Sequence, residues 1–179
     1  EFVANDFDED VHSALERGLI ELLGPELGGK LRAGRSRNDQ VATDFRLFLR
    51  FEAQNLQVLL RELARTFAIR ALENVDSAAP GFTHLQHAQP VSFGHELAKH
   101  SHALLRDISR LDDWRARHNF SPMGAGALAG SSLPLDPLKV ATELGFIGPM
   151  ANSIDAVSSR DFVSEFLFVC SQIGINLSR

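Results

Sequence analysis

The chain has 179 residues, 44% hydrophobic and 23% charged, which is enough for one globular domain with a core. Its formal net charge of −5 argues against a nucleic-acid partner, since such a partner needs a basic face. No apolar run approaches the roughly 20 residues of a membrane span, and no signal-peptide layout opens the chain. The single Cys170 excludes an internal disulfide and favours the cytoplasm, and no zinc-type spacing of Cys and His occurs.

The first predicted helix covers residues 6–23. Its acidic residues Asp8–Asp10 stand in the first turn, where the helix dipole favours anions. Gly24–Pro25 ends the pattern. The apolar positions at helical spacing are Val11, Leu15, Leu19, Leu22 and Leu23.

The next segment, residues 35–79, contains no Gly or Pro, and its apolar residues recur every three or four positions. This pattern predicts a helix of some 35 residues, which would span about 50 Å at 1.5 Å per residue. That length is typical of a helical bundle, because one globular core does not need it. Pro80–Gly81 ends the helix.

The rest of the chain adds three more helices. One follows Pro90 and runs to about Arg117, a short one covers residues 136–144, and a final one starts near Ser158. Residues 119–135 form a loop rich in Gly, Ala and Ser. Because we find no alternating strand pattern and no repeat, we predict an all-α fold.

Three polar or Gly-rich segments carry the chemistry. The first, Gly34–Gln40, places arginines, whose planar donor fork matches a carboxylate, at the start of the long helix. Ser36 with Asp39 three residues later fits a helix N-cap, so taken alone the segment could be a cap with solvated charges. The other two segments are Gly81–Pro90 and Ser121–Gly130.

In this order and spacing, the three segments resemble the argininosuccinate lyase family of the fumarase/aspartase superfamily. The resemblance also includes Asp8–His12 near the start, and Asn152–Ala156 and Ser159–Phe162 near the end. It implies an all-α, long-helix bundle and a carbon–nitrogen lyase that splits argininosuccinate into arginine and fumarate by β-elimination, as part of arginine biosynthesis. The alternatives are another superfamily lyase of the adenylosuccinate lyase, fumarase or aspartase type, or a non-catalytic, crystallin-like relative.

The resemblance implies His84 as the catalytic acid/base residue, and histidine exchanges protons near neutral pH. It does not decide whether His84 or the serine of a mobile family loop takes the carbon proton. The predicted substrate-binding residues are polar side chains of the motif segments: Arg37, Asn38, Thr83, Gln86, His12 and Ser36. The serine loop is not recognised in the chain, although residues 130–134 superficially look like it.

We expect no cofactor and no metal. Gly124–Ala129 fits the dinucleotide pattern G-x-G-x-x-A, but a polar segment precedes it where that pattern requires a strand. The first residues lack an initiator Met and the final helical pattern is unfinished, so we expect an interior piece of a longer polypeptide, inactive alone.

We expect residues 1–34 to end an N-terminal helical domain and residues 35–179 to begin a central bundle domain. The family resemblance further implies a cytoplasmic homotetramer whose active sites are shared between subunits.

Overall fold

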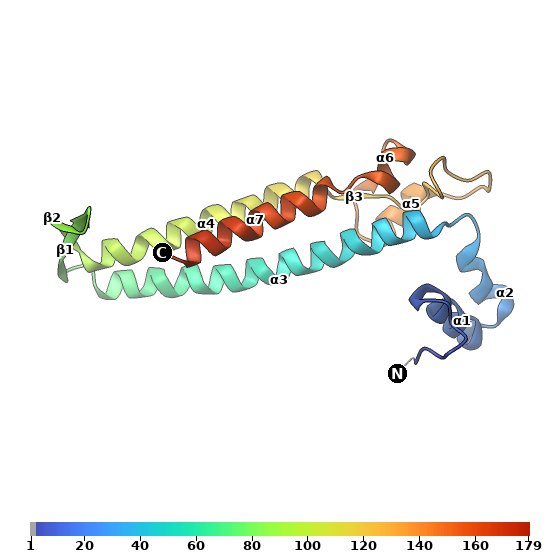
Figure 1. Cartoon of the computed structure of the whole chain (residues 1–179), viewed down its shortest axis with the longest axis horizontal. Helices are drawn as coiled ribbons and strands as arrows, with labels where there is room; N and C mark the ends of the chain where they lie inside the picture. The colour runs from blue at the N-terminus through green and yellow to red at the C-terminus, as the bar shows by residue number, and fades with distance from the viewer. Residues whose placement is uncertain (1–2) are drawn as a thin grey trace. The chain divides into compact units, whose positions relative to one another are not determined.

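A computed structural model of the chain describes residues 3–179 (Figure 1). The chain forms two compact units. The first unit comprises the residues up to Asp44 together with Phe120–Ser159, and the second comprises Phe45–Asn119 with Arg160–Arg179. The long helix α3, Arg37–Glu73, begins in the first unit and continues through the second.

The first unit is made of short elements around the start of α3. They are the helices α1 (Val11–Leu23), α2 (Pro25–Gly28), α5 (Pro137–Glu143) and α6 (Ser153–Ser158), the 3₁₀ turn η1 (Gly29–Arg32), and the parallel strand pair β3 (Phe120–Ser121) and β4 (Gly148–Pro149). Helix α1 starts later than predicted, because Asp10 has an extended backbone and accepts a hydrogen bond from Ser13 N at 2.8 Å. Asp10 is therefore the N-cap.

The second unit is a bundle of the main part of α3 with α4 (Phe93–Arg117) and α7 (Asp161–Leu177), of which α4 and α7 lie side by side (Figure 1). Trp114, near the end of α4, is almost fully buried, and its indole N–H donates to the Phe162 carbonyl at the start of α7 at 2.8 Å. The predicted long helix, the helix up to Arg117 and the all-α class are confirmed. Buried apolar side chains of all three helices form the core: Leu49, Ala53, Leu60, Ala64, Leu104, Ile108, Leu111, Trp114, Phe162, Phe166, Val169 and Ile173.

A β-hairpin between α3 and α4 was not predicted. Strand β1, Ala78–Thr83, pairs antiparallel with β2, Gln86–Ser92, and the register shifts between Pro80 and Phe82. Most of its side chains are exposed, so neither face carries the apolar alternation by which a half-buried strand is recognised.

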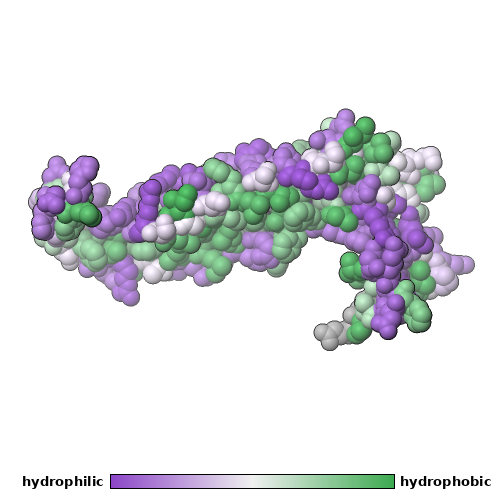
Figure 2. Space-filling model, viewed as in Figure 1, coloured by the Kyte–Doolittle hydropathy of each residue, from purple (hydrophilic) through white to green (hydrophobic). Residues whose placement is uncertain are grey.

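The second unit exposes much apolar surface, which the hydropathy colouring shows along the bundle (Figure 2). Phe48 and Phe51 on α3 are 56% and 59% exposed, and Leu167 and Phe168 on α7 are 59% and 57% exposed.

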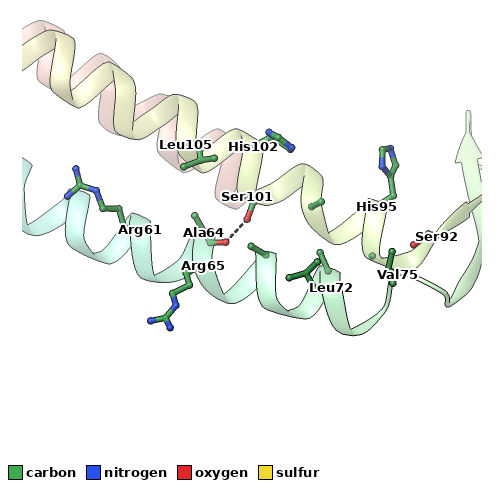
Figure 3. A pocket seen from close by; sticks show the side chains of 14 residues that line it. Arg61, Ala64, Arg65, Leu72, Val75, Ser92, His95, Ser101, His102 and Leu105 are labelled. Carbon is green, nitrogen blue, oxygen red and sulfur yellow. Dashed lines mark hydrogen bonds between the residues drawn. The ribbon is translucent and has the colours of Figure 1, made fainter.

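A groove of about 850 Å³ also lies between α3 and α4, where Ser101 Oγ donates to the Ala64 carbonyl (Figure 3). Among residues 3–179, no helix has the length and apolar character to cross a membrane.

Candidate functional site

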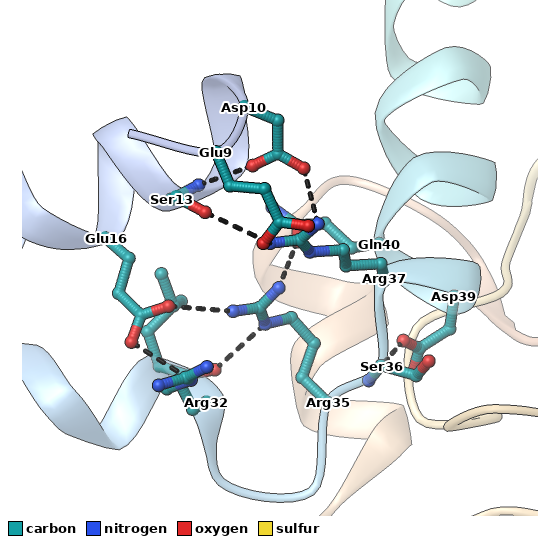
Figure 4. Close-up of polar contacts among 11 residues, drawn as sticks. Glu9, Asp10, Ser13, Glu16, Arg32, Arg35, Ser36, Arg37, Asp39 and Gln40 are labelled. Carbon is teal, nitrogen blue, oxygen red and sulfur yellow. Dashed lines mark hydrogen bonds and ion pairs between the residues drawn. The ribbon is translucent and has the colours of Figure 1, made fainter. Parts of the chain in front are cut away.

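Two hydrogen bonds close the first turn of α3, one between Ser36 and Asp39 (Figure 4) and one between Asn38 and Ser36. Ser36 N donates to Asp39 Oδ1 at 3.0 Å, and Asn38 N donates to Ser36 Oγ at 3.2 Å. These bonds satisfy two of the N–H groups that a helix start leaves unpaired. The predicted N-cap at Ser36 is therefore confirmed.

Arg37 lies against the start of α1 (Figure 4). Its guanidinium forms ion pairs with Glu9 and Asp10 and donates to Ser13 Oγ at 3.0 Å. The backbone N–H of Ser13 and, to a smaller extent, the Arg37 charge hold the pKa of Asp10 below its ordinary value. Arg37 thus already binds carboxylates, and the Glu9 side chain, 80% exposed, is the partner that an incoming carboxylate could most easily replace.

Beside Arg37 is a polar cavity of about 130 Å³. Three guanidinium groups and one carboxylate line it, and one of the three, Arg37, also pairs with Glu9 and Asp10. Glu16 bridges two of these arginines, at 3.1 Å from Arg32 Nε and 3.7 Å from Arg35 Nη2. His12 also lines the cavity, and within the described residues its buried Nδ1 has no hydrogen-bond partner. The arrangement can hold a small anion.

The cavity brings together two predicted site residues, His12 and Arg37, and adds three that sequence reasoning missed: Glu16, Arg32 and Arg35. Arg35 belongs to the first motif segment, so its neighbourhood could have indicated a role. Arg32 and Glu16 carry no such signal, because each reads as an ordinary charge on a turn or helix surface.

The third motif segment packs against the first. Asp39 Oδ2 accepts hydrogen bonds from Gly124 N at 3.1 Å and Gly126 N at 2.9 Å, and Asn38 Nδ2 donates to the Ala127 carbonyl at 2.9 Å. Both glycines have left-handed backbones, with φ of 105° and 62°. Since Asp39 takes these N–H groups and no helix follows until Pro137, the segment lacks the geometry of a dinucleotide-binding turn.

The second motif segment forms the tip of the β1–β2 hairpin. Thr83 and Gln86 are paired, and His84 and Leu85 make the two-residue turn between them. Their φ angles are 50° and 60°, in the region that Gly or Asn usually occupies in such turns. All four side chains are exposed, and within the described residues His84 makes no side-chain hydrogen bond or ion pair.

A left-handed backbone costs an ordinary residue roughly 1–2 kcal/mol. His84 and Leu85 both carry this cost, although their side chains are exposed to solvent. Strain of this kind clusters at functional positions. The hairpin tip is therefore a candidate part of the functional site, and the side chain of His84 is exposed to solvent there.

The predicted site residues fall into two groups. His12, Ser36, Arg37 and Asn38 belong to the first unit, whereas the hairpin with Thr83, His84 and Gln86 belongs to the second.

In the part of the chain that the structure describes, no group of three or more His, Cys, Asp or Glu residues could hold a metal ion.

Comparisons of sequence confirm the resemblance. A family model described as Lyase matches residues 1–179. The chain is 64% identical over 172 residues to the argininosuccinate lyase of Frankia casuarinae, covering 96% of this chain and 37% of that protein. It is 60% identical over 172 residues to the argininosuccinate lyase of Acidothermus cellulolyticus, covering 96% of this chain and 35% of the relative. The chain thus spans little more than a third of the length of these relatives.

Comparisons of structure agree on the fold. An EDDS lyase in complex with formate matches with a TM-score of 0.86 and 32% identity, over 93% of this chain and 33% of that one. A fumarate lyase:delta crystallin from Brucella melitensis, bound to cobalt, matches with a TM-score of 0.77 over 93% of this chain and 38% of that one. At 23% identity, the second likeness shows the fold alone. Since the family match runs over every residue, the chain belongs to the lyase family.

Proposed function

We propose that the full-length protein containing this chain cleaves argininosuccinate into arginine and fumarate by β-elimination. The substrate is that named for the relatives at 60% and 64% identity. The structural observation that carries the proposal is the strained hairpin tip, which holds a histidine outward between Thr83 and Gln86.

The reaction removes a proton from the carbon next to a carboxylate, breaks the bond from the neighbouring carbon to a guanidine nitrogen, and protonates that nitrogen. Negative charge builds on the carboxylate as the proton leaves, so donors aimed at it supply a large part of the acceleration. In our proposal His84 exchanges a proton with the substrate, and Thr83 and Gln86 position the substrate beside it.

The carboxylate-binding groups are then those at the start of α3. Arg37 offers a guanidinium that already pairs with carboxylates, and Ser36 and His12 stand beside it. Asn38 uses one side-chain N–H on Ala127, and the second N–H of its amide can reach a ligand. The three guanidinium groups that line the cavity together with His12 support the binding of a substrate with several carboxylates.

We further propose a cytoplasmic homotetramer with shared active sites. The exposed apolar side chains of α3 and α7, and the groove between α3 and α4, are surfaces that other helices of such an assembly would cover. In the chain, Asn38 stands at the first turn of α3 and His84 follows its last turn. We propose that each active site combines the Asn38 segment of one subunit with the His84 segment of another subunit.

The test is an assay of the full-length protein for fumarate release, followed by ultraviolet absorbance. We expect release from argininosuccinate and none from adenylosuccinate, malate or aspartate. A preference for one of those three substrates would assign the protein to another branch of the superfamily. A folded full-length protein that is inactive on all four would instead support a crystallin-like structural role.

A further inference from the structure

The side chain of Asp39 is fully buried, and three backbone N–H groups donate hydrogen bonds to its carboxyl group. Ser36 N reaches Oδ1, and Gly124 N and Gly126 N both reach Oδ2. A buried carboxylate is tolerated when hydrogen bonds satisfy its oxygens, and N–H donors from two segments do so here. One side chain therefore joins the first turn of α3 to a loop more than 80 residues later in the sequence.

The loop cannot adopt this position with ordinary residues at its two contact points. A Cβ on Gly126 would lie 2.7 Å from the Gly130 carbonyl oxygen, and a Cβ on Gly124 would lie 2.8 Å from the Pro137 ring. Their positive φ angles exclude most side chains as well. The glycines thus allow the backbone to approach Asp39 closely.

The residues next to Asp39 are those that the proposed function assigns to substrate carboxylates. Asn38, the adjacent residue, also contacts the loop through Ala127. Arg37 precedes it in the same helical turn. Movement of the loop or of the first turn would therefore move the side chains that bind the substrate.

We infer that Asp39 is a positioning residue for the proposed reaction: its carboxylate locks the Gly124–Gly126 loop onto the first turn of α3 and so fixes Arg37 and Asn38. This inference rests on the proposed function. Asp39 itself does not touch the substrate, because its side chain is enclosed by its three donors. Its loss is expected to weaken substrate binding more than the chemical step.

The test is Asp39→Asn in the full-length protein, measured as kcat and KM with argininosuccinate. The amide keeps the size of the side chain but replaces one acceptor oxygen with a donor, so it cannot serve all three N–H groups. We expect kcat/KM to fall about 10²-fold, as for a misplaced binding group, with most of the change in KM.

The matched control is Asp136→Ala. Asp136 is the N-cap of α5 in the same unit, where it accepts hydrogen bonds from Leu138 N and Lys139 N at 3.0 and 3.1 Å. It should lower the melting temperature through the lost cap while kcat and KM stay unchanged. If Asp39→Asn has wild-type kinetics, or changes kinetics no more than the control does, the inference is overturned.

Amide hydrogen exchange tests the contact between Asp39 and the loop without any measurement of activity. Amide hydrogen exchange of residues 122–130 should be slow in the wild type and clearly faster in Asp39→Asn, with the core helix α4 unchanged. Equal exchange rates of this loop in the two proteins would contradict the inference that Asp39 holds the loop in place. An inactive wild type would reject the proposed function, whereas an active wild type with an indifferent Asp39→Asn would reject this inference alone.

Discussion

The first turn of α3 and the tip of the β1–β2 hairpin carry the two groups of proposed site residues, and they are built in opposite ways. At the first turn, hydrogen bonds and ion pairs from α1 and the Gly124–Gly126 loop hold the polar side chains. At the tip, the side chains of Thr83, His84 and Gln86 are exposed, and the backbone of His84 is strained.

The difference indicates how the site is completed. The proposed carboxylate-binding part is organised within this chain, because hydrogen bonds and ion pairs with neighbouring residues already hold its donors. The hairpin presents a histidine whose partners are not supplied by the described residues. In our account those partners come from another subunit. The backbone strain at the tip then has a functional reason, because it places His84 in a site that is complete only in the assembled oligomer.

The largest expected effect is that of His84→Asn in the full-length protein. Turnover should fall by roughly 10²–10⁴-fold, the usual contribution of a general acid/base, with little change in stability because the side chain is exposed. His87→Asn is the matched control, since His87 lies on the same hairpin and its ring packs at a tilt against Phe82, with 5.0 Å between the ring centroids. Wild-type turnover in folded His84→Asn would remove the hairpin tip from the site.

Arg37→Lys tests the first turn. Lysine keeps the charge but loses the planar fork, so we expect KM to rise about tenfold, equal to the loss of about 1.4 kcal/mol of binding. Arg70→Lys is the control, because Arg70 forms an exposed ion pair with Glu73 in the last turn of α3. If Arg37→Lys is as silent as Arg70→Lys, Arg37 is a structural partner of Glu9 and Asp10.

Leu85→Gly tests whether the strained backbone matters by itself. Glycine removes the left-handed penalty but adds flexibility to the unfolded chain, so stability should rise by less than about 1 kcal/mol. Turnover should fall several-fold, because the turn would hold His84 less rigidly. Leu85→Ala removes the exposed side chain and keeps the strain, so it should behave like wild type. Equal turnover in all three proteins would show that the turn geometry has no role.

The smallest effect concerns the segment before α1. Hydrogen bonds from Arg17 lower the pKa of Asp8 from 3.8 to about 2. A depressed carboxyl pKa adds stability above the unfolded value, and this contribution is lost as the pH falls from about 4 towards 2. Asp8→Asn should therefore be less stable than wild type at pH 6, and the gap in urea midpoint should narrow steadily as the pH falls from 4 to 2. A gap that stays constant with pH would mean that the ion pair contributes nothing.

The sequence predicted the elements whose signals are local. The Gly- and Pro-free stretch from residue 35 gave the long helix, and Ser36 with Asp39 gave its cap. The hairpin was missed because its exposed strands, broken by Pro80, Gly81 and Pro90, show no alternation. The second role of Asp39 could not be predicted, because its glycine partners are more than 80 residues away and meet it only in the fold.

The most direct test of the shared site is complementation in the full-length protein. Asn38→Ala and His84→Asn, each expected to be nearly inactive, are mixed under conditions that allow subunit exchange, and fumarate release is measured once native mass spectrometry shows mixed oligomers. Activity should return in part, because some sites would receive an intact Asn38 from one subunit and an intact His84 from another. Mixed oligomers that recover no activity would contradict the account.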